Sequence, residues 1–365
     1  MSRKAFAPEY QGALGSSLCV NSSYEEVLVK ASEEQRRSLL EFARAGLAVA
    51  EANRRLGRVV DAERAWRESY RAARRAEDRG AMAWALWSGG TLARQRGRLP
   101  LARRWLAAAV ELAEQGGDRL ALGYSVAGLA ETGRIQGDYP AVGALHERLL
   151  KEARQHGEAR HMVWALEGIA QMHRNTGSYD TALAMFEEAA DIAERAEDHR
   201  GWAWALRGIA DVLSLQGRPE RALELLFEAE QTCRAMNLSS ALAYNRKMRA
   251  NVLFRDGQYE EAASVYDEAL RRFRDIGEPR GESLSRLGLV KSRSRLGRPN
   301  RETLADLDEL HSVFERIGLE QAQASVESFR AELVEQSGSE TPWLHVQSVR
   351  AAASPQGPDI DTDRR

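Results

Sequence analysis

Five aromatic side chains recur at intervals of forty residues, and their type and spacing point to molecular recognition. They are Trp84, Tyr124, Trp164, Trp204 and Tyr244. On a helix, the residues three, seven and ten positions after each aromatic share its face, because these spacings lie close to whole turns. Aromatic rings are frequent anchors of binding surfaces, since they bury a large area. The column therefore predicts a binding surface that runs across several repeats.

Cationic side chains accompany the aromatics on the same helix faces. An arginine column with the same forty-residue spacing comprises Arg54, Arg94, Arg134 and Arg174. A guanidinium can hold a carboxylate through two parallel hydrogen bonds. Arg94 and Arg174 have no acidic residue three or four positions earlier, so we expect them to be free to meet a ligand. The candidate ligand-binding residues are Trp84, Trp87, Arg94, Tyr124, Arg134, Trp164, Arg174, Trp204, Arg207, Tyr244, Lys247 and Asn251.

Packing and internal charge pairing are the alternative interpretation of these columns. A tryptophan repeated at helical spacing can fill the space between neighbouring helices and contact no ligand. Several charges also have partners close by in the sequence. These pairs are Glu51 with Arg54, Glu131 with Arg134, and Arg207 with Asp211. The pattern alone leaves both interpretations open.

The sequence carries no motif that assigns a catalytic chemistry. Phosphate-loop, dinucleotide-binding, zinc-protease and serine-nucleophile motifs are absent, and the seven histidines are never spaced as metal ligands. We expect His146 and His173 to be packing residues, because each occupies a column of core side chains. We therefore predict no catalytic residue, no metal and no cofactor. An enzyme that uses Glu131, Glu167 and Asp211 stays an alternative.

Seven glycines at the same interval explain how such columns can form. They are Gly57, Gly97, Gly137, Gly177, Gly217, Gly257 and Gly297. Small residues recur seven positions before and five positions after most of them, such as Ala170 and Ala182 around Gly177. Small side chains on both sides of a turn allow two helices to cross closely. Each repeat is therefore predicted to be an antiparallel helix pair that turns back at its glycine.

A column of acidic residues lies where one helix pair ends and the next begins. It lies 21 residues after the glycines and comprises Asp78, Asp118, Glu158, Asp198 and Glu278. A carboxylate here favours the N-terminus of the following helix, which carries a partial positive charge. The column predicts that every second helix begins in register.

The two ends of the chain depart from this pattern. Ser23 with Glu26 and Ser32 with Gln35 have the spacing of capping boxes, which predicts helices from residues 24 and 33. We divide the chain into an irregular segment with a short helix (1–32), a solenoid (33–318), a closing helix (319–336) and a disordered tail (337–365).

Residues 168–193 and 251–270 carry a resemblance to the tetratricopeptide repeat family. In the first segment, a glycine turn and an aromatic are followed by Ala182, Phe186 and Ala189 along the second helix. The forty-residue repeats are longer than the family's minimal repeat and resemble those of Pins-type adaptors. The resemblance implies an all-α, right-handed superhelical solenoid of about seven antiparallel helix pairs plus a closing helix.

The same resemblance implies a concave peptide-binding groove that the aromatic column faces. Lys247 and Asn251 resemble half of the clamp with which some family members hold a C-terminal carboxylate. Gly288 stands where an asparagine would complete that clamp, so binding of a chaperone tail is not expected.

Composition restricts the partners further. The net charge of −2 offers no basic surface to nucleic acid or to an anionic membrane. Cys19 and Cys233 form no paired motif, and no apolar run is long enough for a signal or a membrane span, so we expect a cytoplasmic protein.

We predict a scaffold that binds an extended peptide segment of a partner protein, with acidic groups, in the concave groove. Two alternatives stay open: a regulatory protein that senses a peptide or small molecule and acts through a partner, and a small-molecule enzyme with its active site in the groove. The sequence identifies neither the partner nor the oligomeric state.

Overall fold

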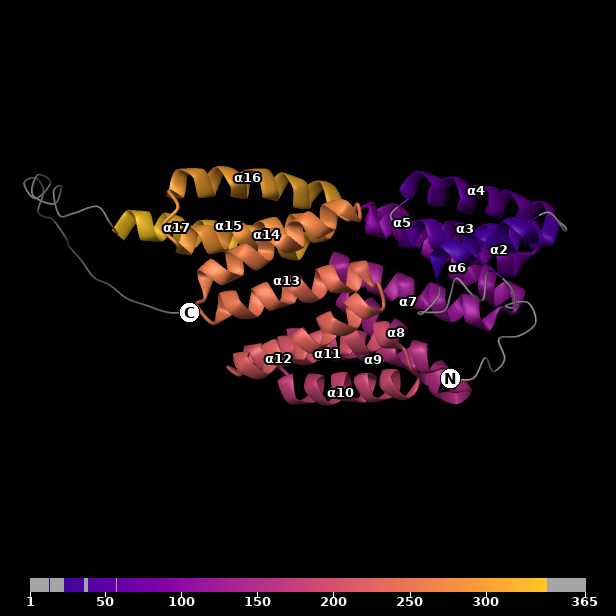
Figure 1. The fold of residues 1–365 in the computed structure, drawn as a ribbon, viewed down its shortest axis with the longest axis horizontal. Helices are drawn as coiled ribbons and strands as arrows, with labels where there is room; N and C mark the ends of the chain where they lie inside the picture. The colour runs from indigo at the N-terminus through magenta and orange to yellow at the C-terminus, as the bar shows by residue number, and fades with distance from the viewer. Residues whose placement is uncertain (1–12, 14–22, 36–38, 57, 340–365) are drawn as a thin grey trace, which may run out of the picture.

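The structure, a computed structural model, describes residues 13, 23–35, 39–56 and 58–339. This part of the chain contains sixteen helices of eleven residues or more and no strand (Figure 1). The helices are α2 (Tyr24–Glu34), α3 (Leu39–Arg55), α4 (Val59–Arg75), α5 (Arg79–Gln95), α6 (Leu99–Gly116), α7 (Arg119–Gln136), α8 (Tyr139–His156), α9 (Ala159–Asn175), α10 (Tyr179–Arg195), α11 (His199–Leu215), α12 (Pro219–Ala235), α13 (Ser239–Arg255), α14 (Tyr259–Asp275), α15 (Pro279–Arg295), α16 (Asn300–Ile317) and α17 (Glu320–Ser339).

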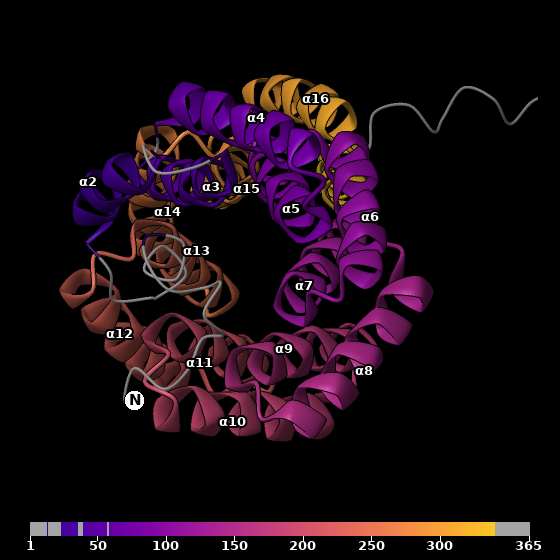
Figure 2. The same ribbon diagram turned by 90° about the vertical axis from the view of Figure 1, so that its right-hand side faces the viewer.

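Consecutive helices pair into hairpins that stack side by side. The odd-numbered helices from α3 to α15 form the inner layer, and the even-numbered helices from α4 to α16 form the outer layer (Figure 2). Each inner helix also contacts the next inner helix. Seven hairpins, α3/α4 to α15/α16, and the closing helix α17 follow a right-handed superhelix, so the predicted fold class is confirmed. No helix within the described residues is long and apolar enough to cross a membrane.

The small residues on both sides of each glycine turn form the closest contacts within the hairpins. Ala170 and Ala182 are fully buried, as are their counterparts in the other hairpins from the first to the sixth. Between hairpins, a large side chain of an outer helix fills the gap left by a glycine of the next inner helix. The Phe186 ring occupies such a gap, since a Cβ added to Gly208 would lie 2.3 Å from it. The stack is therefore held together by complementary small and large columns.

Two columns of left-handed residues produce the turns. The glycines that end the inner helices have positive φ, for example +72° at Gly97 and +75° at Gly217, whereas Gly57 lies outside the described residues. The turns that end the outer helices use the same backbone conformation. Gly117, Gly157 and Gly277 occupy this second column, but so do Glu77, Glu197 and Asn237, with φ of 53° to 54°. A non-glycine residue is strained in this region by roughly 1–2 kcal/mol.

Replacing Glu77 with Gly is expected to raise the free energy of unfolding by about 1 kcal/mol, because it removes that strain. Urea unfolding of the variant measures the change. Glu68→Gly is the matched control: Glu68 is also exposed but lies inside α4, where glycine costs about 1 kcal/mol. A loss of stability at both positions would contradict the assignment of strain to residue 77.

The N-terminal predictions have mixed outcomes. The Ser23 hydroxyl accepts a hydrogen bond from the Glu26 backbone amide at 3.5 Å, which confirms Ser23 as the N-cap and a helix from residue 24. The second capping box is wrong, because α2 continues through Ser32, whose hydroxyl instead donates to the Leu28 carbonyl at 2.9 Å. The next described helix, α3, begins at Leu39. The predicted irregular segment, apart from Ala13, and nearly all of the predicted tail lie outside the described residues.

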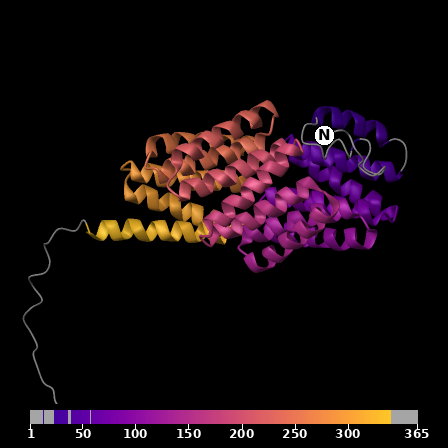
Figure 3. The ribbon, with the colours of Figure 1, turned by 90° about the horizontal axis from the view of Figure 1, so that it is seen from below.

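The superhelix completes enough of a turn for its last hairpin and closing helix to contact the second and third hairpins. The turn between α16 and α17 packs on the turns that end α5 and α7: a Cβ added to Gly97 would lie 2.9 Å from Ile317. Leu99, Ile135 and Ile317 belong to one buried cluster. The Gln321 amide donates a hydrogen bond to the Tyr139 hydroxyl, across 182 residues of sequence. Viewed from below, α17 extends from the last hairpins (Figure 3). The contact around Ile317 joins the seventh hairpin to the second and third.

Candidate functional site

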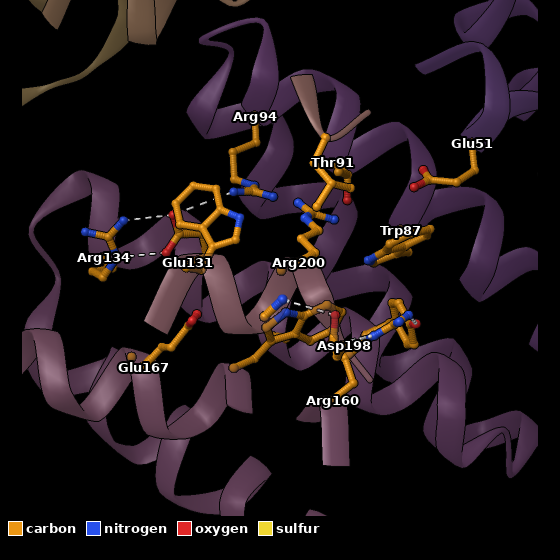
Figure 4. A pocket seen from close by; sticks show the side chains of 18 of the residues that line it. Glu51, Trp87, Thr91, Arg94, Glu131, Arg134, Arg160, Glu167, Asp198 and Arg200 are labelled. Atoms are coloured by element: carbon orange, nitrogen blue, oxygen red, sulfur yellow. Dashed lines mark hydrogen bonds and ion pairs between the residues drawn. The ribbon is translucent and has the colours of Figure 1, made fainter. Parts of the chain in front are cut away.

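A cavity of about 180 Å³ lies between the inner helices (Figure 4). Side chains of α3, α5, α7, α9 and α11 line it, together with Tyr24 of α2, His146 of α8, Asp198 just before α11 and Leu238 just before α13. A water molecule needs roughly 10–15 Å³ on this scale, so the space corresponds to about a dozen water positions. The cavity can therefore hold a short segment of a ligand.

The predicted aromatic column divides between the cavity and the helix packing. Tyr124, Trp164 and Trp204 line the cavity, and so does Trp87. Trp84 does not: it is 2% exposed, and its indole donates a hydrogen bond to Asp118 at 3.1 Å.

Neighbouring rings in the column also pack on one another. The ring centroids of Tyr124 and Trp164 are 5.0 Å apart, and those of Trp204 and Tyr244 are 5.2 Å apart. Both interpretations that the sequence left open therefore apply to this column: the rings pack adjacent inner helices together, and some of them also line the cavity.

Tyr244 lies outside the cavity lining, in a polar contact of its own. Its hydroxyl donates to Glu278 and accepts a hydrogen bond from Arg280 at 2.7 Å. Burial is the main cause that raises the pKa of Tyr244 well above its usual range. The Tyr124 hydroxyl likewise accepts a hydrogen bond from an arginine, Arg160, at 2.9 Å.

Two of the four arginines in the predicted column pair across a repeat boundary. Arg94 lies 3.7 Å from Glu131, and Arg174 forms an ion pair with Asp211. Each acidic partner belongs to the next inner helix, 37 residues further along the chain. The expectation that Arg94 and Arg174 are free is therefore wrong, because it considered only partners within the same helix.

The remaining column members pair within their own helices, as the sequence suggested. Arg134 contacts Glu131 at 2.7 Å, and Arg54 contacts Glu51 at 2.6 Å. Burial alone would raise the pKa of Glu51, but Arg54 and Arg55 outweigh it and lower that pKa to about 2.

Three ionisable cavity residues have no ion-pair partner within the described chain: Glu167, Arg200 and Arg207. Burial raises the pKa of Glu167 to about 8, and its Oε1 atom is buried without a hydrogen bond. Burial lowers the pKa of Arg207 to about 10, and its guanidinium lies 4.2 Å from the Trp204 ring centroid. Burial, with Arg55 and Arg54 close by, lowers the pKa of Arg200 to about 9. Of the three carboxyl groups considered for an enzyme, only Glu167 is unpaired, since Arg side chains hold Glu131 and Asp211.

Lys247 and Asn251 lie outside the cavity lining, as does Arg174. Burial lowers the pKa of Lys247 to about 8. The Asn251 side chain accepts a hydrogen bond from the Tyr266 hydroxyl at 2.7 Å, and the Tyr266 ring fills the space above Gly288. Asn251 is therefore engaged within its own hairpin.

The two histidines expected to be packing residues differ. His146 is 3% exposed, and its ring fills the gap at Gly168 as Phe186 fills the gap at Gly208. It also lines the cavity, and neither ring nitrogen has a hydrogen-bond partner among the described residues. His173 is only half-buried.

Sequence reasoning missed Arg55, Arg160, Arg200 and Asp198 as cavity residues. Arg160 and Arg200 are each the second residue of an inner helix, and Arg280 holds the same position in α15. Counting forward from the acidic column would have revealed this set, because each arginine stands two residues after a position of that column. The acidic column itself was recognised, but only as a helix start.

An all-helical superhelix of stacked hairpins defines a class of fold, the α-helical repeat solenoids. Residues 161–235 match the tetratricopeptide repeat model. This match, together with the fold, confirms the tetratricopeptide repeat resemblance. No curated protein sequence matches the chain.

Solved structures share the fold over most of the chain. The complex of NprR with its cognate peptide NprX has a TM-score of 0.65 at 15% identity, covering 91% of this chain and 93% of NprR. A Rap protein complexed with competence and sporulation factor has a TM-score of 0.59 at 13% identity, covering 87% of this chain and 92% of Rap. The Rap conjugation gene regulator of plasmid pLS20, in complex with the Phr* peptide, has a TM-score of 0.53 at 15% identity, covering 77% of this chain and 78% of that regulator. At these identities the likeness establishes the fold.

Proposed function

We propose that this protein binds a peptide segment inside its inner cavity and that binding regulates a partner protein. The observation that carries the proposal is the cavity lining, in which aromatic faces lie beside unpaired charged groups. Arg200 and Arg207 are half-buried cations with no ion-pair partner in the described chain, and Glu167, whose pKa is raised to about 8, has a buried Oε1 atom without a hydrogen bond. A half-buried cation without a partner has lost part of its hydration, so a ligand that supplies a carboxylate recovers part of that free energy.

The charge of the lining supports a ligand with acidic groups. Seven arginines but only four carboxyl groups line the cavity, so the lining has an excess of positive charge. The likeness to NprR and to the Rap conjugation gene regulator, whose structures contain peptides, adds support for a peptide rather than another anion. A cytoplasmic location and the lack of direct nucleic-acid binding are part of the proposal and rest on the cysteine pattern and the net charge.

Loss of an aromatic cavity wall should weaken peptide binding. The experiment selects binders from a random pool of short peptides on the immobilised protein and measures the affinity of the most enriched peptide by calorimetry. Trp164→Ala and Trp204→Ala are each expected to lower its affinity roughly 30-fold, corresponding to about 2 kcal/mol for an anchor residue. Phe227→Ala is the matched control, because Phe227 is an aromatic residue of the outer helix α12 with 58% exposure. Equal affinity in all four proteins would overturn the proposal.

Regulation predicts a change of shape that a passive adaptor would not show. The contact between Ile317 and the turn at Gly97 closes the superhelix, so a ligand held between the inner helices can alter its pitch. Small-angle scattering with and without saturating peptide distinguishes the two: a changed radius of gyration supports a sensor, and an unchanged radius supports a scaffold.

A further inference from the structure

The unpaired state of Arg200 can be traced to two positions in the repeat pattern. Arg160, Arg200 and Arg280 are each the second residue of an inner helix, so the superhelix presents them in equivalent places. Arg160 shows what this place normally provides. It donates to the Tyr124 hydroxyl at 2.9 Å and to the Asp198 carboxylate at 3.2 Å.

These partners lie 36 residues before and 38 residues after Arg160. The same offsets from Arg200 lead to Trp164 and Leu238. An indole has no hydrogen-bond acceptor comparable to a phenol oxygen, and a leucine has none at all. Arg280 also keeps the tyrosine partner, since it donates to the Tyr244 hydroxyl at 2.7 Å. Arg200 is thus the member of the set from which the sequence has removed both partners.

Leu238 interrupts the acidic column at this point. The equivalent residues are Asp78, Asp118, Glu158, Asp198 and Glu278. Leu238 and Trp164 both line the cavity, so the places of the missing carboxylate and the missing hydroxyl face the space that a ligand would occupy. Figure 4 shows Arg200 reaching toward Thr91 in the middle of the cavity, whereas Arg160 lies beside Asp198.

We infer that Arg200 is the docking group for a carboxylate of the ligand, which takes the place left by the missing acidic side chain at position 238. This inference rests on the proposed peptide function and specifies how the same cavity recognises its ligand. A carboxylate fits because it is the group that the equivalent arginine, Arg160, binds within the protein. The carboxylate belongs either to the C-terminus of the peptide or to an Asp or Glu side chain.

The other arginines of the lining are less available. Arg54 and Arg55 are held by Glu51, and Arg94 and Arg134 approach Glu131. Arg207 lacks an ion pair but stacks on Trp204. A ligand carboxylate at Arg200 therefore displaces no internal ion pair of the described chain.

The test uses the full-length protein and three pools of synthetic pentapeptides. One pool has free C-termini and no Asp or Glu, the second is C-terminally amidated and equally free of acidic residues, and the third is amidated with a single Asp or Glu. Binding is followed by tryptophan fluorescence and by the shift of the thermal midpoint. For the wild type, at least one carboxylate-bearing pool should bind about tenfold more tightly than the second pool. The pool that does so identifies the source of the carboxylate.

Two substitutions address the site itself. Arg200→Gln should abolish the preference for carboxylate-bearing peptides while circular dichroism shows the fold to be retained. Leu238→Asp should have the same effect by a different route, because the new side chain supplies the missing internal partner of Arg200. Leu238→Asn isolates the effect of charge, since Asn has nearly the shape of Asp without its charge and should weaken the preference less than Leu238→Asp does. Arg195→Gln, on the outer helix α10 at 70% side-chain exposure, should be neutral.

The possible failures are distinguishable. Binding of all three pools with equal affinity, or a carboxylate preference that survives Arg200→Gln, would overturn the docking role and leave peptide binding intact. Absence of binding from all pools would contradict the proposed function, and the docking role with it. If Leu238→Asp proves unstable, Arg200→Gln with the three pools still decides the question.

Discussion

Replacing Leu99 with Asp is expected to open the superhelix and to lower the free energy of unfolding by about 4 kcal/mol or more. Leu99 is fully buried in the cluster that joins the end of α16 to the earlier turns. The substitution removes buried apolar volume and places a carboxylate inside a hydrophobic cluster. Urea unfolding measures the stability, and small-angle scattering measures the expected increase in the radius of gyration.

A milder variant keeps this prediction testable if Leu99→Asp does not fold. Ile317→Ala removes the side chain that faces Gly97, and we expect it to cost about 2–4 kcal/mol and to produce the same expansion. Leu215→Asp is the control, because Leu215 lies at the end of an inner helix with 37% exposure. A wild-type radius of gyration in both closure variants would show that the contact does not hold the superhelix closed.

The second large effect concerns His146 and acid. Burial lowers the pKa of His146 from 6.5 to about 4; Glu131 opposes this shift, whereas Arg134 adds to it. Because the folded protein then binds fewer protons than the unfolded chain, the stability associated with neutral His146 is complete above pH 6.5. It is lost progressively as the pH falls from 6.5 toward 4. Converted at 1.36 kcal/mol per pKa unit, the full loss is on the order of 3 kcal/mol, of which about 2 kcal/mol is expected by pH 5.

His146→Phe is expected to remove this dependence, since phenylalanine already fills the equivalent gap in the next hairpin at Phe186. Urea unfolding of wild type and variant, without peptide, at pH 7.5 and at pH 5 gives the comparison. Between pH 7.5 and pH 5, the free energy of unfolding should fall by about 2 kcal/mol more in the wild type than in the variant. The other titrating groups are common to both proteins and cancel in the difference. If the stabilities of the two proteins change in parallel with pH, His146 has the same pKa in the folded and unfolded states, which would contradict the prediction.

The candidate site was only partly accessible from the sequence, and the reason is the range of the interactions involved. Contacts within one helix follow from spacing, so the pairing of Glu51 with Arg54 could be read directly. Contacts between hairpins depend on how far neighbouring inner helices are offset along their axes. This is why the partner of Arg174, Asp211, was not foreseen. The unpaired state of Arg200 needed both the offset and the identity of residues 36 and 38 positions away.

The sequence by itself determined the repeat. A glycine that can adopt positive φ, flanked by small residues, specifies a helix hairpin through local conformation and close packing, and the period of forty repeats it along the chain. Only the tertiary structure decided that Ile317 packs on Gly97, and that the inner helices surround a cavity in which Arg200 has no ion-pair partner from the described residues. The cavity follows from the offset between neighbouring inner helices. The contact of Ile317 with Gly97 follows from the small rotation between successive hairpins, which accumulates over the repeats and brings together residues whose separation is no multiple of the period.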